Sequence, residues 1–193
     1  MTTAIDKDLV SRAVRRDPDA TATLLAQLRP GLVRYCRARL GRIGGAYSTA
    51  DDVAQEVCLA LLRALPKYRE QGRPFTAFVY AIAANKVVDA QRAAIRAAVA
   101  EPVDSMLEEP DGTPGPEQQA LATDLARRLS GLLGRLTGTQ REIVLLRVAV
   151  GLSAEEVGEV VGMSAAAVRV AQSRALARLR TLAGDSLGEV SAA

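Results

Sequence analysis

Apolar residues recur at helical spacing along most of the chain. Between residues 51 and 65 they occupy positions i, i+4, i+7, i+8 and i+11 of one helix face, namely Val53, Val57, Ala60, Leu61 and Ala64. Similar patterns predict helices at about 6–15, 20–40, 50–65 and 75–99, the second of them broken or bent at Pro30. Further helices are predicted at about 116–136, 137–150, 153–161 and 164–183. We therefore expect an all-α fold.

One segment interrupts this helical pattern. Residues 100–119 read AEPVDSMLEEPDGTPGPEQQ and hold four prolines and two glycines. Proline removes backbone donors and glycine adds chain entropy, so a packed helix is not expected here. We predict two helical domains, residues 1–97 and 118–193, joined by a flexible acidic linker at 98–117 that is rich in proline and glycine.

Charge is spread unevenly along the chain. The net charge of +3 divides into +7 over residues 1–96, −7 over residues 97–126 and +3 over residues 127–193. Two basic ends around an acidic middle indicate two modules that face a polyanion and a separate connector. No apolar run approaches the roughly 18 residues that span a bilayer, and the N-terminal residues lack the pattern of a secretory signal. We expect a cytoplasmic protein that is not itself a membrane protein.

The residue types that most often carry catalysis or bind metals are scarce. The chain has no histidine, which removes the commonest general base and zinc ligand. Cys36 and Cys58 are the only cysteines, and both fall in helical patterns, so we expect reduced thiols and no disulfide. The sequence therefore predicts neither a cofactor nor a metal site.

Residues 153–180 fit a helix-turn-helix. A short helix with three glutamates is followed by a turn at Gly162 and by a longer helix with four arginines, which Ser164 is expected to cap. One face of the longer helix is apolar. The opposite face, and the first turn with its small side chains, carry the residues expected to approach a DNA groove: Ser164, Ala165, Arg169, Ser173, Arg174 and Arg180. The alternative is a solvated amphipathic helix packed on its neighbours.

A second basic region suits a different nucleic acid. Four of the six aromatic residues fall within thirteen positions, namely Tyr68, Phe75, Phe78 and Tyr80. Arg69 and Arg73 lie among them, and Lys86, Arg92 and Arg96 follow. Aromatic faces stack on unpaired bases while cations follow the backbone, so this region indicates single-stranded nucleic acid. The alternative for Phe75 and Phe78 is that they belong to the core.

A third feature is an acidic edge on an otherwise apolar helix, formed by Asp51, Asp52, Gln55 and Glu56. Three acids at this spacing have three interpretations. They can hold a hard cation, they can stabilise the start of the helix through its dipole, or they can dock on a basic protein surface. The residues alone leave these alternatives open.

Together the three features resemble one family, the extracytoplasmic-function sigma factors of the sigma-70 family of bacterial RNA polymerase. The stretch ADDVAQEVCLALLRALPKY resembles the helix that docks on the beta-prime clamp coiled coil. The stretch RPFTAFVYAIAANKVVDAQR resembles the segment that melts and recognises the minus-ten element, and residues 136–180 resemble the domain for the minus-thirty-five element. The last helix also resembles that of a D-type actinobacterial subgroup.

The resemblance implies a function and its partners. It implies a protein that directs core RNA polymerase, through its beta-prime and beta subunits, to promoter DNA and helps to open that DNA without bond chemistry. It assigns docking to Asp51, Asp52, Gln55 and Glu56, and minus-ten recognition to Arg73, Phe78, Tyr80, Asn85, Lys86, Asp89 and Arg92. The helix-turn-helix residues given above would read the minus-thirty-five element. Such factors are commonly held inactive by an anti-sigma protein, often anchored in the membrane.

The sequence departs from the family pattern at a few positions. Phe78 stands where the family commonly has tryptophan, and Val170, Ala171 and Gln172 replace a serine, an arginine and a leucine of the last helix. Base specificity therefore does not carry over from the family, whereas Arg169 and Arg174 match it well.

The sequence also permits two rival functions. One is a stand-alone helix-turn-helix regulator with a helical dimerisation or sensing lobe, which would bind promoter DNA without polymerase. The other is a helical metal-dependent hydrolase that uses Asp51, Asp52 and Glu56, although no second cluster of carboxylates or histidines completes such a site.

Overall fold

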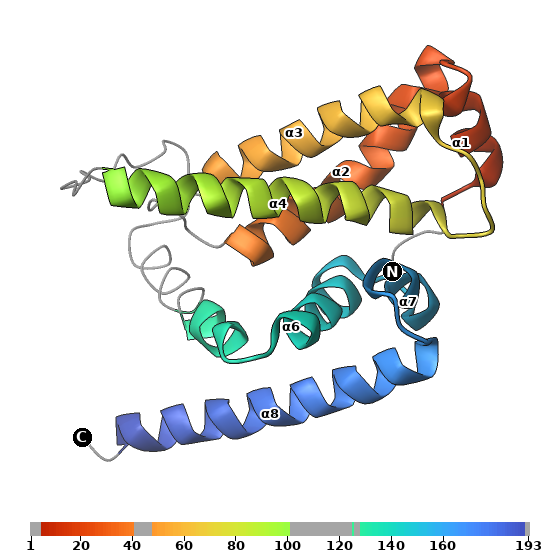
Figure 1. Ribbon diagram of the computed structural model, residues 1–193. Helices are drawn as coiled ribbons and strands as arrows, with labels where there is room; N and C mark the ends of the chain where they lie inside the picture. The colour runs from red at the N-terminus through yellow and green to blue at the C-terminus, as the bar shows by residue number, and fades with distance from the viewer. Residues whose placement is uncertain (1–4, 41–47, 101–124, 126–127, 192–193) are drawn as a thin grey trace.

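The computed structural model describes residues 5–40, 48–100, 125 and 128–191, and these residues form helices and connecting turns with no strand among them. The N-terminal part holds α1 (Lys7–Val14), α2 (Pro18–Leu40), α3 (Ser48–Ala64), a 3₁₀ turn η2 (Leu65–Lys67) and α4 (Phe75–Ala100). The C-terminal part holds α6 (Gly138–Val144), a π-helical turn η3 (Leu145–Val150), α7 (Ala154–Val161) and α8 (Ala165–Ser191), preceded by helical residues at 128–134. The all-α prediction is confirmed (Figure 1).

Two of the predicted boundaries differ from the structure. Helix α2 runs through Pro30 without a break. Proline removes one backbone donor, but the buried Leu28 and Leu32 on either side hold the helix against the core. Residues 98–100, assigned to the linker, form the end of α4. The rest of the predicted linker, residues 101–117, lies outside the described residues.

Helices α1 to α4 form a first lobe around a common apolar core. Its largest fully buried side chains come from α2, α3 and α4: Leu24, Leu32, Tyr35, Val57, Leu61, Val79 and Val87. Cys36 is buried and Cys58 half-buried, and both are free thiols, as expected. Burial raises the pKa of Cys36 to about 12, so this thiol stays protonated at neutral pH.

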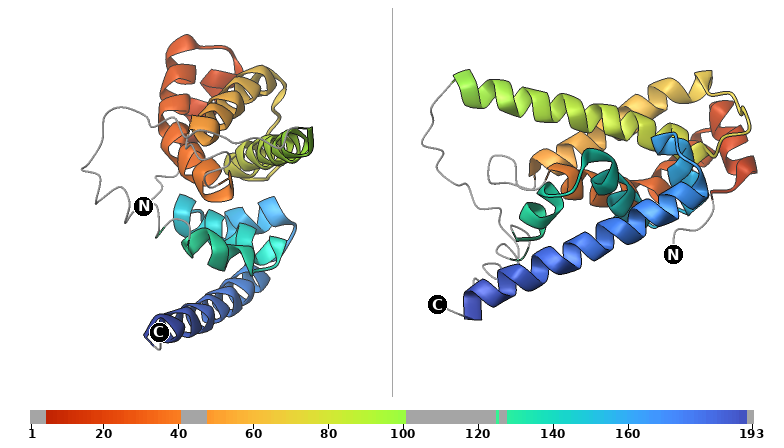
Figure 2. Two further views of the ribbon diagram at one scale, coloured as in Figure 1. Left: turned by 90° about the vertical axis from the view of Figure 1, so that its left-hand side faces the viewer. Right: turned by 60° about the horizontal axis from the view of Figure 1, so that its bottom comes forward.

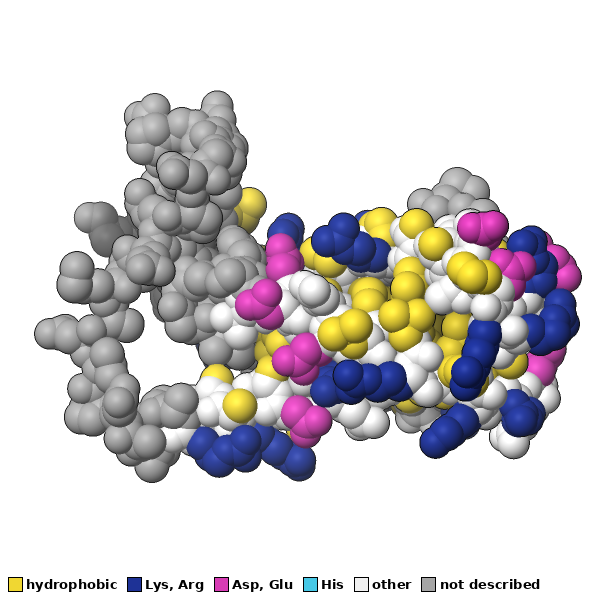
Figure 3. All heavy atoms as spheres, turned by 90° about the horizontal axis from the view of Figure 1, so that it is seen from above, with side chains coloured by type: hydrophobic (Ala, Val, Ile, Leu, Met, Phe, Trp, Pro, Cys, Tyr) yellow, Lys and Arg dark blue, Asp and Glu magenta, His cyan; other side chains and the backbone are white. Residues whose placement is uncertain are grey.

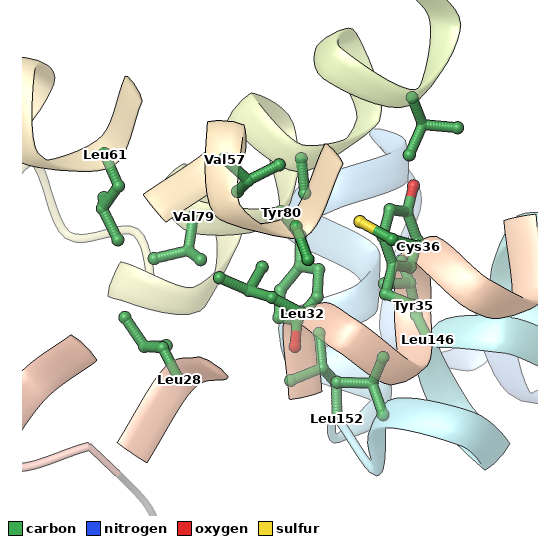
Figure 4. Packing of buried hydrophobic residues seen from close by; sticks show 14 of the residues in the cluster. Leu28, Leu32, Tyr35, Cys36, Val57, Leu61, Val79, Tyr80, Leu146 and Leu152 are labelled. Atoms are coloured by element: carbon green, nitrogen blue, oxygen red, sulfur yellow. The ribbon is translucent and has the colours of Figure 1, made fainter. Parts of the chain in front are cut away.

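Residues 128–191 form a second lobe that shares the core of the first. Ile143, Leu146, Val150, Leu152, Val157 and Val168 belong to the same buried cluster as the first-lobe residues. Figure 4 shows Leu146 and Leu152 beside Leu32, Tyr35 and Tyr80 of the first lobe. Figures 1 and 2 show α6 and α7 between the first lobe and α8. We call this arrangement the closed form.

The long helices of the chain are amphipathic or mixed in character. Over the part of the chain that the structure describes, none combines the length and the apolar character needed to cross a bilayer.

Candidate nucleic-acid interface

The predicted helix-turn-helix is formed by α7 and α8. Helix α7 begins with a capping box in which the Ser153 hydroxyl accepts from the Glu156 backbone N–H and the Glu156 carboxylate accepts from the Ser153 backbone N–H. It ends at Gly162, whose φ of 71° lies in the left-handed region that favours glycine. Ser164 then accepts a hydrogen bond from the Ala167 backbone N–H at 3.2 Å and caps α8. The turn and its cap are as predicted.

Gly158 closes this turn, and the sequence analysis did not identify it. A Cβ atom on Gly158 would lie 2.5 Å from the backbone oxygen of Met163. The Met163 backbone N–H also donates to the Gly158 oxygen at 2.9 Å. The close approach of the two helices therefore requires a glycine at this position.

The outward face of α8 carries most of the predicted DNA contacts. Val168 and Ala175 are fully buried against the rest of the lobe. Ser164, Arg169, Ser173, Arg174 and Arg180 are exposed, whereas Ala165 is half-buried and packs on the core. At 100° per residue, Arg169 and Arg174 flank opposite edges of the outward stripe that contains Ser173. The helix therefore presents two cations on either side of a narrow polar stripe.

The acidic helix α7 neutralises one of these cations. The Arg169 guanidinium donates to the carboxylate of Glu155, and the side chains are 59% and 60% exposed. Backbone hydrogen bonding and this guanidinium lower the pKa of Glu155. Arg174 has no side-chain partner among the described residues. Exposed ion pairs are weak, so Arg169 can exchange Glu155 for a DNA acceptor at little cost.

The departures from the family pattern on α8 have structural explanations at two of three positions. The Gln172 side chain accepts a hydrogen bond from Nε of Arg147 at 3.0 Å, which ties α8 to η3. Ala171 packs on the shared core, where an arginine would be partly buried. Val170 is 50% exposed on the outward face. It is an apolar candidate for contact with a thymine methyl group that the sequence analysis did not include.

Helix α4 presents three of the predicted minus-ten side chains on one face. Asn85, Asp89 and Arg92 are exposed at positions i, i+4 and i+7, the spacing of a single helical stripe. Lys86 points to the side and forms an ion pair with Glu56 of α3 at 3.3 Å. The stripe is therefore open to a ligand in the closed form, while Lys86 links it to the acidic edge of α3.

The aromatic residues near the start of α4 form a cluster. Tyr68 contacts Phe75 edge-on with ring centroids 5.1 Å apart, and Phe78 lies 4.9 Å from Tyr68 and 5.9 Å from Phe75. All three are half-buried and pack against the core. The structure supports a packing role for Phe75 and Phe78, and the partly exposed Phe78 stays a predicted DNA contact.

Two predicted minus-ten residues are engaged by other groups in the closed form. Tyr80 is 3% exposed and packs edge-on against Tyr35 at 5.5 Å. Its hydroxyl approaches Gly31, where a Cβ atom would lie 2.7 Å from it. Arg73 forms an ion pair with Glu159 of α7 at 2.9 Å. Tyr80 is therefore not accessible to a base in the closed form, whereas the exposed Arg73 is bound to Glu159.

Asp51 is tied to α2, whereas the other three residues of the acidic edge of α3 are more exposed. Both carboxylate oxygens of Asp51 accept from the Arg37 guanidinium, at 2.8 and 2.6 Å, and this hydrogen bonding lowers the pKa of Asp51. Asp52, Gln55 and Glu56 are exposed. Leu59, which the sequence analysis omitted, continues the same stripe at 46% exposure. The edge therefore combines carboxylates with an exposed apolar side chain.

A groove of about 380 Å³ runs beside this edge between α2 and α3. It is lined by Leu25, Ala26, Arg29, Val33, Asp51, Ala54, Gln55 and Cys58. Figure 3 shows the same side of the molecule, with apolar side chains gathered between charged ones. Within the described ranges, no group of three or more Cys, Asp or Glu is arranged to hold a metal ion. The groove places apolar side chains of α2 and α3 beside the polar residues of this edge.

Comparison with known proteins places the chain among transcription factors. Residues 24–97 match the family model for Sigma-70 region 2, and residues 126–179 match that for Sigma-70, region 4. The chain is 55% identical over 178 residues to the ECF RNA polymerase sigma factor ShbA of Streptomyces griseus subsp. griseus, covering 91% of this chain and 93% of ShbA. It is 52% identical over 180 residues to SigD of Mycobacterium tuberculosis, covering 92% of this chain and 84% of SigD.

A solved structure has the same fold. CnrH of Cupriavidus metallidurans, determined in complex with the cytosolic domain of CnrY, matches with a TM-score of 0.68 and 26% sequence identity. The match covers 93% of this chain and 97% of CnrH.

Proposed function

Since this chain belongs to the extracytoplasmic-function sigma factors of the sigma-70 family, we propose that three of its surfaces divide the work of promoter recognition. Membership confirms the predicted function: the protein directs core RNA polymerase to promoters and helps to start transcription, and it is not an enzyme. The identity with SigD also confirms the resemblance to an actinobacterial D-type subgroup. The residue assignments below are our proposal.

The exposed edge of α3 is the proposed polymerase-docking surface. Asp52, Gln55 and Glu56 offer carboxylate and amide groups to a basic partner, and Leu59 and the adjacent groove offer apolar contact. The beta-prime clamp coiled coil is the proposed partner, with further contacts to the beta subunit. Asp51 orients α3 against α2 through Arg37, so its role is positioning rather than direct contact.

The exposed stripe of α4 is the proposed minus-ten surface. Asn85 can donate to and accept from base edges, and Arg92 can bind a backbone phosphate. Asp89 lies between them, and its carboxylate can accept hydrogen bonds from the exocyclic amino groups of unpaired bases. Arg73, Phe78, Tyr80 and Lys86 complete the surface once the lobes have separated.

The outward face of α8 is the proposed minus-thirty-five surface. The observation that carries the whole proposal is that this exposed arginine-bearing helix follows, on one chain, an α4 stripe that suits unpaired bases. One surface that suits duplex DNA and another that suits single-stranded DNA, on the same chain, are what a factor needs in order to locate a promoter and then to open it. We assign these surfaces to domains at residues 1–97 and 118–193.

We further propose an anti-sigma partner and a cytoplasmic location. CnrH was solved with the cytosolic domain of CnrY, which supports a protein partner that can be anchored in a membrane. RNA polymerase and chromosomal DNA share the cytoplasm, so the sigma factor acts there.

Reversing two exposed charges on α3 tests the docking surface. The double variant Asp52→Lys/Glu56→Lys should bind core RNA polymerase at least tenfold more weakly, because like charges at an interface repel. Affinity is measured by fluorescence anisotropy of the labelled chain, and helicity by circular dichroism. The matched control Asp8→Lys/Asp19→Lys reverses two exposed acids in the first turns of α1 and α2, away from the groove.

The control variant should keep wild-type affinity for the polymerase. A folded Asp52→Lys/Glu56→Lys variant that also keeps this affinity would remove α3 from the docking surface. A loss of helicity in that variant alone would instead indicate that the acids stabilise the helix.

A further inference from the structure

The outward face of α8 has an uncharged centre. Val168 and Ala175 are buried, so a turn of 100° per residue directs another set of side chains away from the rest of the lobe. These side chains belong to Ala166, Val170, Ser173 and Ala177, and all four are exposed. This set, which we call the central stripe, therefore consists of small or apolar side chains.

Arginines lie on both sides of the central stripe. Arg169 and Arg180 lie along one edge and Arg174 lies along the other, and all three are exposed. Phosphates line the walls of a major groove, whereas its floor presents the edges of the bases. A helix with cations along both edges fits such a groove when the central stripe faces the floor.

Contacts on the inner side of α8 hold the helix in this orientation. The Gln172 side chain accepts a hydrogen bond from Nε of Arg147 at 3.0 Å, and Arg147 also donates to the backbone oxygen of Leu152. Gln172 lies about 160° from Val170 around the helix axis. This hydrogen bond and the burial of Val168 therefore keep Val170 directed outward.

Val170 differs from the rest of the central stripe in its size. Over the part of α8 whose side chains the structure describes, it is the one large apolar residue that is exposed. Valine favours a helix less than the alanines of the same stripe do, so an exposed valine adds little to the stability of the free chain. Val170 is thus an apolar group placed where a helix in a major groove meets the base edges.

Thymine is the base whose edge suits an exposed valine. In the major groove it presents a C5-methyl group, which the other three bases lack. Contact with Val170 would remove both apolar groups from water, and the burial of one methyl group changes affinity about fourfold. A polar group such as the amino group of cytosine would instead lose water beside valine without gaining a partner.

We propose that Val170 contacts the C5-methyl group of a thymine in the minus-thirty-five element and sets the preference for thymine at that position. The inference rests on the proposed function of the outward face of α8, and it adds a base preference that the arginines do not supply. A base-pair step is about 3.4 Å, so a side chain next to Arg169 should meet a base pair within about two steps of the one that Arg169 reads.

The test removes the methyl group from the DNA and the valine from the protein, separately and together. Holoenzyme formed with the full chain first selects promoters from a library with a randomised minus-thirty-five element. In one selected promoter, each thymine of that element, on either strand, is replaced singly by deoxyuridine, which lacks only the C5-methyl group. Binding of wild-type and Val170→Ala holoenzyme to each DNA is measured by competition with the unmodified promoter.

Wild-type holoenzyme should bind about fourfold more weakly when one particular thymine is replaced. Val170→Ala holoenzyme should bind the same two DNAs with nearly equal affinity, because it lacks the group that contacts the methyl. If that thymine is replaced by cytosine, methylation of the cytosine at C5 should strengthen wild-type binding by a similar factor and leave Val170→Ala binding unchanged. Val148→Ala, which truncates an exposed valine of η3 outside α8, is the matched control and should respond to deoxyuridine like wild type.

A selected element without thymine would overturn the inference, and so would deoxyuridine substitutions that never weaken wild-type binding. An equal loss in wild type and Val170→Ala would also overturn it, because another group would then contact the methyl. In each of these cases the selection of an element still supports the proposed function of α8. Failure of the holoenzyme to select any minus-thirty-five element would instead contradict that function, and the inference with it.

Discussion

Holoenzyme that carries Arg174→Ala should lose roughly tenfold to a hundredfold in transcription from every minus-thirty-five sequence, whereas Arg169→Ala should relax the preference at one or two positions. The two arginines lie five residues apart, which is about 7.5 Å along a helix at 1.5 Å per residue. They flank the outward stripe of α8, so each can reach a different wall of one major groove. Their expected effects differ because their environments differ.

Arg174 has the environment of a phosphate contact. It is exposed and makes no side-chain contact among the described residues, and phosphate contacts supply affinity that is independent of sequence. Losing one such charged hydrogen bond costs about 1.5–3 kcal/mol, which corresponds to the stated fold-change. Loss of one phosphate contact should also flatten the salt dependence by about one unit of slope.

Arg169 has the environment of a base reader. It lies near the first turn of α8, where the side chains of Ser164 and Ala167 are small, and its guanidinium pairs with the exposed Glu155. An arginine on a guanine edge discriminates by about 1–3 kcal/mol. The Arg169→Ala variant should therefore lose discrimination rather than output.

The measurement is promoter selection from a library with randomised minus-thirty-five elements, followed by sequencing of the transcripts at two salt concentrations. Arg135→Ala, which removes an exposed arginine of the second lobe outside α8, is the matched control and should behave like wild type. The opposite pattern would exchange the two roles. No effect from either variant would leave α8 as a solvated amphipathic helix.

The double variant Asn85→Ala/Arg92→Ala should reduce open-complex formation by tenfold or more while initial binding to duplex promoter DNA stays within about threefold of wild type. Both side chains lie on the exposed stripe of α4. The proposed partner of Asn85, the edge of an unpaired base, exists only after the duplex has melted, and Arg92 is proposed to bind a phosphate of the same strand. Losing a hydrogen bond to a neutral group costs about 0.5–1.5 kcal/mol and losing one to a charged group about 1.5–3 kcal/mol. The variant avoids Tyr80, whose truncation would open a cavity in the shared core.

Permanganate reactivity of thymines in the promoter bubble reports opening, and a gel-shift assay reports initial binding. Arg135→Ala, which removes an exposed arginine that lies on neither α3 nor α4, is the control and should open promoters normally. A template with a pre-melted bubble should restore most transcription by the variant. Failure of that template to restore any transcription would mean that these residues do not act on unpaired bases.

Local features of the fold were predictable because short-range chemistry determines them. The period of apolar residues located the helices, and serine before a helix start located the cap at Ser164. The glycine turn at Gly162 was predictable because the left-handed conformation there favours glycine. Pro30 was misleading because packing on both sides of it outweighs the loss of one backbone donor.

The contacts between the lobes were not predictable from these patterns. Tyr35 and Glu142 are 107 residues apart, and Arg73 and Glu159 are 86 residues apart, so no local spacing links them. The sequence shows an acidic short helix followed by a basic long helix. It does not show which residues the acidic side chains bind. In the structure Glu155 binds Arg169 of the same lobe, while Glu156 and Glu159 bind Thr76 and Arg73 of the other.

Site residues could be predicted where the position of a residue on its helix determines its exposure. They could not be predicted where tertiary packing determines whether the side chain is exposed. Asn85, Asp89 and Arg92 form the expected open stripe, because residues at i, i+4 and i+7 share a face. Tyr80 is buried because it packs on Tyr35 and Gly31 of α2 in the shared core, which the sequence of α4 does not reveal. Leu59 and Val170 were missed because exposed apolar residues look like core residues in a periodic pattern.

The central claim, that this chain gives core RNA polymerase its promoter specificity through two separate surfaces, is tested most directly by transcription from a pool of genomic DNA. Core RNA polymerase is supplied with the wild-type chain, with no chain, or with the Asp52→Lys/Glu56→Lys variant, and RNA 5′ ends are mapped by sequencing. We predict a set of start sites that appears only with the wild-type chain and shares one sequence element near −10 and another near −35. The same distribution of start sites with and without the wild-type chain would contradict the account.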